Sequence, residues 1–321
     1  MHFGKRLAIH TSIINTKIII IVIFFIIYLI LFNNIKSSNL SHVFFNTFLY
    51  LLSFSDGMQA RILFLGTGGD AFTVGKQLRA SGGVILNFEA SQFHLDPGPG
   101  ALVMAKMMSL NLRETTGILI SGNDLFRAND INAVVSAMTH DGLDKRGVLV
   151  CPSSVLDARS QIGPFLNKYY AGCLEKTIIT DNTKKLGINN IDIEVVELME
   201  PLNMGFKFTT SRFVLGYIPD TGFTEDLGEK YRDVDILIIT VQDPKSVNRK
   251  EHLNSEMAQK VIRKANPQLA LITGFGIKMI EADSLYEARE IQKETGIQVI
   301  AVKDGMTINP ISFTTTVRQK P

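Results

Sequence analysis

The stretch RILFLGTGGD, residues 61–70, opens the folded part of the chain. Residues 61–65 are mostly apolar and predict a short buried strand, which three glycines follow almost at once. Similar short apolar runs recur downstream and alternate with helical patterns, which indicates an α/β fold. We predict further strands at 83–88, 117–120, 147–151, 191–198, 207–215, 236–241, 269–273 and 298–302, and helices at 101–110, 129–138, 255–265 and 278–293.

The composition is that of a globular protein with a sizeable core. Of its 321 residues, 45% are apolar and 20% are charged, and the net charge is +2. Residues 58–321 are close to neutral and show no strong signal for nucleic-acid binding. The two cysteines, Cys151 and Cys173, exclude a disulfide scaffold and a Cys-based zinc site, and we expect both to be free and buried.

The glycines after the first strand do not form a nucleotide-binding motif. A dinucleotide fingerprint requires a third glycine where Ala71 stands, and a helix start that the following FTVGKQLRASGG does not resemble. A P-loop requires a glycine at Asp70 and a hydroxyl residue at Gln77. We therefore expect the glycines of GTGGD to serve a tight turn with positive φ.

Residues 1–57 form a separate leader with an unbroken apolar run, IIIIVIFFIIYLILF (18–32). One interpretation is a transmembrane helix at about 14–32, which would anchor domain 58–321 to the membrane. The basic residues before the helix would keep the N-terminus in the cytoplasm. The alternative is a misplaced start, because Met58 directly precedes the first strand and the Ile-, Phe- and Asn-rich leader has the composition of AT-rich upstream sequence. The protein would then be cytoplasmic.

Several segments share an order and spacing that point to one family. They are RILFLGTGGD (61–70), FHLDPGPGALV (93–103), GYIPDTGF (216–223), EHLNSEMA (251–258), GFGIKMIEA (274–282) and VKDGM (302–306). Together they resemble the metallo-β-lactamase superfamily, and within it the ribonuclease Z-like and phosphodiesterase-like hydrolases, over essentially all of 58–321. The resemblance implies a four-layer αββα sandwich, here preceded by the apolar helix of the leader, with its active site along one edge.

The resemblance also implies a centre of two zinc ions, but most of its ligand positions hold other residues here. Those of the His-x-His-x-Asp-His loop and of the final histidine are Gly122, Asp124, Phe126, Arg127 and Gly274. The bridging aspartate corresponds to Asp220, and no residue could be placed for the histidine before the GFKF strand (205–208). Because a catalytic zinc needs about three protein ligands, we expect no metal and no other cofactor. A weakly held Mg²⁺ on Asp124 and Asp220 stays an alternative.

Arg127 suggests what replaces the metal charge. Its guanidinium could bind both Asp124 and Asp220, which would otherwise repel each other in a cleft of low dielectric. Phe126 would then fill part of the former metal cavity. The alternative places Arg127 in solvent at the start of a helix.

The remaining candidates have structural and functional interpretations. We expect Asp96, Gly98 and Gly100 to shape a structural loop below the former metal site. We expect His94 to be a half-buried, hydrogen-bonded residue and His140 to close a helix, where an imidazolium suits the helix dipole.

His252 corresponds to a histidine that ribonuclease Z-like enzymes use near the scissile phosphate. His252 and Asp220 are therefore the two candidate catalytic residues. Alternatively, His252 could open the helix that follows.

These inferences favour a catalytically inactive binding or assembly subunit. Its expected partner is a protein, with an active homologue as one candidate and a second copy of the chain as another. The alternative is a phosphodiesterase or nuclease with an atypical or single-metal site at Asp124, Asp220 and His252. A membrane-tethered ligand sensor is a third hypothesis, which depends on translation of the leader.

Overall fold

The computed structural model describes residues 60–157, 163–181, 183–199 and 203–317. They belong to one compact unit, Gln59–Pro321. The predicted membrane span at 14–32 lies outside the described residues. Within the described ranges, no helix has the length and apolar character needed to cross a membrane.

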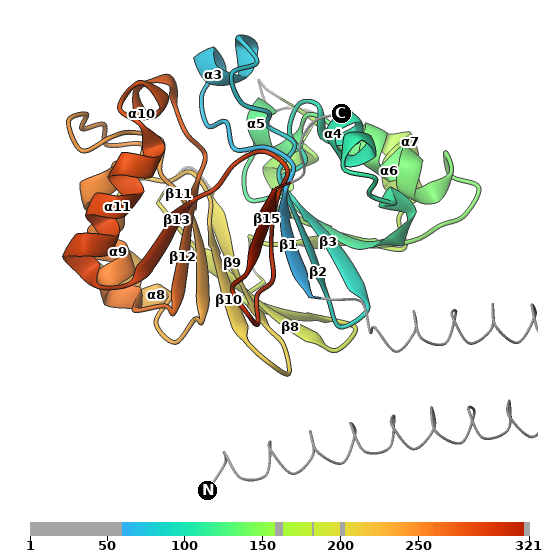
Figure 1. Ribbon diagram of the computed structural model, residues 1–321. Helices are drawn as coiled ribbons and strands as arrows, with labels where there is room; N and C mark the ends of the chain where they lie inside the picture. Colours follow the sequence, from blue (N-terminus) through green and yellow to red (C-terminus); the bar gives the residue numbers. More distant parts are fainter. Residues whose placement is uncertain (1–59, 158–162, 182, 200–202, 318–321) are drawn as a thin grey trace, which may run out of the picture. The chain divides into compact units, whose positions relative to one another are not determined.

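Two mixed sheets form the centre of this unit (Figure 1). The first has the strand order β15-β14-β1-β2-β3-β4-β5-β6 and the second has the order β13-β12-β11-β10-β9-β8-β7. The first sheet comprises β1 (Arg61–Phe64), β2 (Val84–Phe88), β3 (Ser91–Leu95), β4 (Thr115–Leu119), β5 (Val148–Cys151), β6 (Lys176–Ile179), β14 (Met306–Ile308) and β15 (Thr315–Val317). The second comprises β7 (Lys185–Ile188), β8 (Ile191–Glu197), β9 (Met204–Thr209), β10 (Val214–Ile218), β11 (Ile236–Thr240), β12 (Leu269–Thr273) and β13 (Gln298–Ala301).

Helices cover the outer face of each sheet. In Figure 1, α9 and α11 lie on the second sheet, and α4 and α6 lie on the first. The helices are α3 (Ala71–Gly75), α4 (Ala101–Met107), α5 (Leu125–Ala128), α6 (Ile131–Thr139), α7 (Lys168–Gly172), α8 (Leu227–Lys230), α9 (Ser255–Ala265), α10 (Ile277–Glu281) and α11 (Ser284–Thr295), with short 3₁₀ turns at Leu112–Glu114 and Ser153–Val155. The predicted four-layer αββα sandwich is therefore confirmed.

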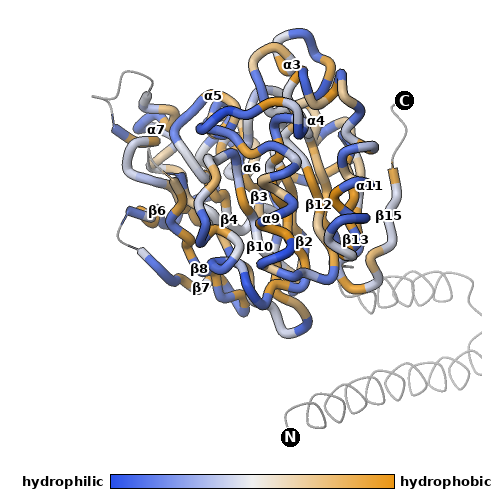
Figure 2. The backbone as a smooth tube through the Cα atoms, turned by 90° about the vertical axis from the view of Figure 1, so that its left-hand side faces the viewer, coloured by the Kyte–Doolittle hydropathy of each residue, from blue (hydrophilic) through white to orange (hydrophobic). Residues whose placement is uncertain are grey.

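The central strands are apolar on both faces because each sheet packs against the other sheet on one face and against helices on the other. In β11, Ile236 and Ile238 pack between the sheets, whereas Leu237 and Ile239 pack under the helices. Strand β1 divides its side chains in the same way. Figure 2 shows the resulting hydrophobic stretches along the strands. Such continuous runs are why the sequence pattern located these strands.

Two predicted elements are wrong because a local turn divides them. The strand at 207–215 is a hairpin of β9 and β10, since the Thr210 hydroxyl accepts hydrogen bonds from the backbone N–H groups of Arg212 and Phe213 and closes a turn. The helix at 278–293 is two helices, α10 and α11. Asp283 adopts φ 66° between them and caps α11 by accepting from Leu285 N–H.

The expectation for the GTGGD glycines is also wrong. Gly66, Gly68 and Gly69 do not have positive φ, and the short helix α3 does begin at Ala71. The glycines are required by close packing: a Cβ on Gly66 would lie 2.4 Å from the carbonyl carbon of Ala80, and one on Gly69 would lie 2.0 Å from the oxygen of Gly274. Backbone from the two halves of the sandwich therefore meets here without room for a side chain.

His94 on β3 is fully buried rather than half-buried. Its Nε2 lies 2.8 Å from the carbonyl oxygen of Gly82, while Nδ1 has no hydrogen-bond partner in the described part of the chain. Burial lowers the pKa of His94 from 6.5 to about 4. The ring is therefore neutral at pH 7, and protonating it inside the folded core would cost free energy.

Acid should accordingly destabilise the fold through His94. In the unfolded chain this residue takes up a proton below pH 6.5, but the folded chain resists doing so until about pH 4, so stability falls across this window. We expect His94→Gln to remove about 2 kcal/mol of the loss between pH 7 and pH 5, measured by urea unfolding. His140→Asn, at an exposed helix end, is the control. Equal pH dependence in wild type and His94→Gln would contradict this assignment.

Candidate functional site

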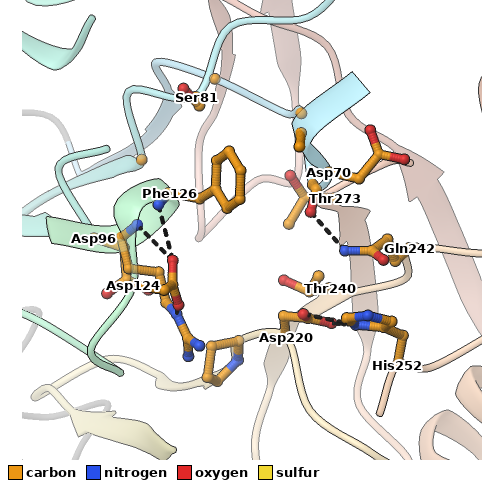
Figure 3. A pocket seen from close by; sticks show the side chains of 18 of the residues that line it. Asp70, Ser81, Asp96, Asp124, Phe126, Asp220, Thr240, Gln242, His252 and Thr273 are labelled. Carbon is orange, nitrogen blue, oxygen red and sulfur yellow. Dashed lines mark hydrogen bonds and ion pairs between the residues drawn. The ribbon is translucent and has the colours of Figure 1, made fainter. Parts of the chain in front are cut away.

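A cleft of about 470 Å³ lies where strand ends from both sheets converge (Figure 3). Loops after β1, β3 and β4 form one wall, and loops after β10, β11 and β12 form the other. Most residues singled out from the sequence line it, namely Asp96, Asp124, Phe126, Arg127, Asp220, His252 and Gly274. The fold thus gathers positions that are up to 178 residues apart in sequence.

Asp96 lies at the base of the cleft and links the two sheets. Its carboxylate accepts hydrogen bonds from the backbone N–H of Ser121 at 2.7 Å, from the Ser121 hydroxyl at 2.6 Å and from the Tyr217 hydroxyl at 2.6 Å. Burial raises the pKa of Asp96, while Arg127 and these donors act in the opposite direction. Ser121 follows β4 and Tyr217 belongs to β10, so one buried carboxylate joins the loop after β4 to a strand of the second sheet.

Asp124 and Arg127 form an ion pair within the first turn of α5. Asp124 caps this helix by accepting from the N–H groups of Phe126 and Arg127, and its second oxygen binds Arg127 Nε. The Arg127 side chain is only 15% exposed. Although burial acts to lower the pKa of Arg127, the charges of Asp124 and Asp96 raise it. The inward orientation predicted for Arg127 is therefore confirmed, and the solvent-facing alternative is wrong.

The guanidinium occupies the space that a side chain at Gly122 would need. A Cβ built on Gly122 would lie 2.4 Å from Arg127 Nη1 and 2.8 Å from Asn203 Oδ1. Asn203 also donates from Nδ2 to the carbonyl oxygen of Asp220 at 3.2 Å. Asn203 directly precedes β9, so it stands in the region for which the sequence offered no candidate ligand.

Asp220 pairs with His252 rather than with Arg127. His252 Nδ1 lies 2.9 Å and 2.8 Å from the two carboxylate oxygens of Asp220, and the two side chains face each other in Figure 3. The hydrogen bond to Asp220 raises the pKa of His252 against the effect of burial. The prediction that Arg127 binds both Asp124 and Asp220 is therefore wrong, because the imidazole of His252 binds Asp220 instead. Asn254, not His252, caps the following helix α9.

Sequence reasoning missed a second cation in the cleft, Arg249. It donates from Nε and Nη2 to the two oxygens of Asp243, each at 2.6 Å, and from Nη2 to Gln242 Oε1 at 2.8 Å. Asp243 is almost fully buried, so this bidentate pair neutralises a charge beneath the cleft wall. The end of β11 could have indicated Asp243 as a site residue, but nothing in the spacing indicated its partner.

Three glycines adjust the backbone around the cleft. Gly274 has φ 66°, and a Cβ there would lie 2.3 Å from Thr240 Cγ2. Gly98 leaves room for the carbonyl oxygen of Phe126, which a Cβ would approach to 2.0 Å. Gly100 begins α4 with φ 87°. The ring of Phe126 itself projects into the cleft, as Figure 3 shows.

The fold and this edge cleft define a metallo-β-lactamase-like protein, and comparison with known proteins agrees. The beta-lactamase superfamily domain matches residues 92–275, which is more than half of the chain. The chain therefore belongs to this superfamily.

One curated relative and two solved structures are similar to this chain over nearly the whole of their own length. An uncharacterized protein of Methanocaldococcus jannaschii, MJ1374, is 29% identical over 255 residues, covering 78% of this chain and 95% of that protein. The metallo-beta-lactamase fold protein YhfI from Bacillus subtilis is 14% identical, with a TM-score of 0.64 over 77% of this chain and 98% of that one. Human tRNase Z, short form, is 14% identical, with a TM-score of 0.58 over 77% of this chain and 98% of that one. The two structural similarities establish the shared fold.

Removal of the Arg127 charge should destabilise the protein because Asp124 and the buried Asp96 would lose their cation. We expect Arg127→Met to lower the free energy of unfolding by about 3 kcal/mol, measured by urea unfolding at pH 7. Arg232→Met, which breaks an exposed pair with Glu229, should cost less than about 1 kcal/mol. Asp96→Asn should cost less in the Arg127→Met background than in wild type. Independent, additive effects of the two substitutions would contradict the coupling.

Proposed function

We propose that this chain is a metal-independent, catalytically inactive binding or assembly subunit of the metallo-β-lactamase superfamily. One observation carries the proposal. The two carboxylates that remain at implied metal positions, Asp124 and Asp220, are each engaged by a cationic or proton-donating side chain of the protein itself. Arg127 holds the first and His252 holds the second.

The donor chemistry of the cleft supports this proposal. Gly122, Phe126, Arg127 and Gly274 provide no ligand atom for zinc, and a guanidinium beside Asp124 would repel a cation placed there. Within the described ranges, no group of three or more His, Cys, Asp or Glu side chains is arranged to hold a metal ion. The residues present therefore do not fit the pair of zinc ions that the superfamily resemblance implies.

Exposed apolar side chains support a protein partner. Phe72 on α3, which lines the cleft, is 66% exposed, and on two further helices at this end of the sandwich Val103 on α4 is 62% exposed and Leu125 on α5 is 48% exposed. Exposed apolar groups of this size are candidate contacts for a protein partner. An active homologue of the same fold is the partner that we propose.

The Asp220–His252 pair favours hydrolysis as a second candidate function. Because Asp220 engages Nδ1 of His252, which lines the cleft, Nε2 is the nitrogen that could protonate a leaving oxygen. The chain would then be a hydrolase with an atypical site that acts on phosphate esters. This candidate requires a source of activated water, which the Arg127 pair does not provide.

Metal analysis and an assay separate the two functions. Protein purified without chelator and incubated with zinc should retain less than one equivalent after gel filtration, because its remaining carboxylates are paired. It should also show no turnover of bis-p-nitrophenyl phosphate. The variant Gly122→His/Arg127→His, which adds two imidazoles and removes the guanidinium, should retain more zinc than wild type. Stoichiometric zinc in wild type, or turnover that chelator or His252→Gln abolishes, would instead support the hydrolase.

Affinity purification of the native protein, followed by mass spectrometry, tests the assembly role. We expect a second chain of this superfamily with an intact His-x-His-x-Asp-His loop to co-purify. Phe72→Ser/Val103→Ser should reduce its recovery, whereas substitution of exposed Leu285 on the far helix α11 should not. Recovery of the chain alone would contradict the proposal. The same spectra identify whether the native N-terminus is Met1 or Met58.

A further inference from the structure

Two threonines form a polar patch in the wall of the cleft. Thr240 ends β11 and Thr273 ends β12, and the two residues are partners in the register of these parallel strands. Each stands two residues after an apolar residue that packs between the sheets, Ile238 in β11 and Leu271 in β12. Since side chains alternate along a strand, both threonines point to the side where the cleft opens. The two hydroxyls therefore lie next to each other in the cleft.

Both hydroxyls are available to a ligand. Thr240 is 7% exposed and Thr273 is 5% exposed, and both line the cleft. Within the described ranges, neither Oγ1 atom has a hydrogen-bond partner, and neither is fully enclosed. The neighbouring Gln242 donates from Nε2 to the carbonyl oxygen of Gly69 instead (Figure 3). A nearly buried hydroxyl without a partner costs free energy, so this pair favours a ligand that bonds to both.

The charged side chains of the cleft disfavour an ionic ligand, because each is already bonded within the chain. Three ion pairs account for most of them, namely Asp124–Arg127, Asp220–His252 and Asp243–Arg249. Asp70 accepts from two backbone N–H groups, and Asp96 accepts from Ser121 and Tyr217. An added ion would have to break one of these bonds or remain without a counter-charge. A neutral ligand avoids this cost and can still bond to the paired groups, since paired carboxylates and guanidinium groups keep free acceptor and donor sites.

An aromatic ring lies across the cleft from the two hydroxyls. Phe126 on α5 projects into the cleft from the side of the first sheet, whereas Thr240 and Thr273 belong to the second (Figure 3). Phe72 on α3 lines the same space. An aromatic face packs against the apolar face of another ring, while hydroxyls bind the polar groups at its edge. The cleft thus combines a surface for a ring with a surface for hydroxyl groups.

We propose that the cleft binds a small neutral ring that carries several hydroxyl groups, a sugar or a cyclic polyol. Thr240 and Thr273 bond to its hydroxyls, since each partner both donates and accepts, and the ring lies against Phe126. The cleft volume of about 470 Å³ accommodates a molecule of this size. This inference rests on the proposed function, because it requires a cleft that is free of metal ions.

NMR titration of the full chain with matched probes tests the ligand class. D-glucose and myo-inositol are neutral, whereas D-glucuronate and D-glucosamine add a negative and a positive charge to the glucose ring. We expect saturable shifts of the Thr240 and Thr273 methyl signals with a neutral probe, and at least about tenfold weaker binding of the charged probes. Uridine tests a planar base as the alternative ring. No saturation by either neutral probe up to about 100 mM, or tighter binding of a charged probe or of uridine, would overturn the ligand class.

Variants decide whether the two threonines form the site. Thr240→Val and Thr273→Val keep a similar shape and remove the hydroxyl, so each should weaken binding by about fivefold, the effect of one lost hydrogen bond. Thr240→Ser keeps the hydroxyl and should bind within about twofold of wild type. Thr316→Val, on the edge strand β15 and outside the cleft, is the matched control. Equal affinity of the valine variants and the control would contradict the assignment, and either valine variant suffices if the other does not fold.

Elemental analysis of every sample separates failure of this inference from failure of the proposed function. Zinc-free protein that binds no neutral probe contradicts the ligand class and leaves the metal-independent role intact. Protein that retains stoichiometric zinc contradicts the proposed function, and this inference with it.

Discussion

The buried carboxylate of Asp96 is the group on which the arrangement of the cleft depends. A charge removed from water is stable only when hydrogen bonds and a counter-charge replace the lost hydration. Ser121 and Tyr217 provide the hydrogen bonds from opposite sheets, and Arg127 provides the counter-charge. The need to neutralise Asp96 thus keeps Arg127 inside the protein, and the capping role of Asp124 keeps it in place.

The same principle extends across the whole cleft. Arg249 neutralises Asp243, His252 binds Asp220, and Asp70 accepts from the backbone N–H groups of Thr73 and Ile277. Charges that are paired within the protein contribute little to attracting an ion from solution.

The sequence predicted the strands and helices that form the layers better than the turns between them. Strands such as β11 and β12 are apolar on both faces, so a short apolar run was sufficient to locate them. The turn at Thr210 and the break at Asp283 depend on single side-chain hydrogen bonds, which periodicity does not register. The short strands β6, β7, β14 and β15 lie at or next to the sheet edges, where burial is weaker and the pattern is correspondingly faint.

The candidate site shows a similar division. Motif order placed Asp124, Arg127 and Asp220 at one edge, and the structure places them there. It could not assign partners, because side chains such as Asn203 and Arg249 reach the cleft from loops whose paths depend on tertiary packing. The sequence left two orientations open for Arg127, and the structure selects the inward one. Only the distances in the structure show that the guanidinium of Arg127 occupies the space beside Gly122.

Gly274 restricts how the cleft could be redesigned. Its left-handed backbone and its contact with Thr240 mean that an imidazole at this position requires a second substitution and a shift of the loop. At Gly122, a histidine would have to displace a guanidinium that a buried acid requires. A histidine introduced at either position alone would therefore strain the loop or leave the buried carboxylate without its counter-charge. Neither position can be redesigned independently of the residue that packs against it.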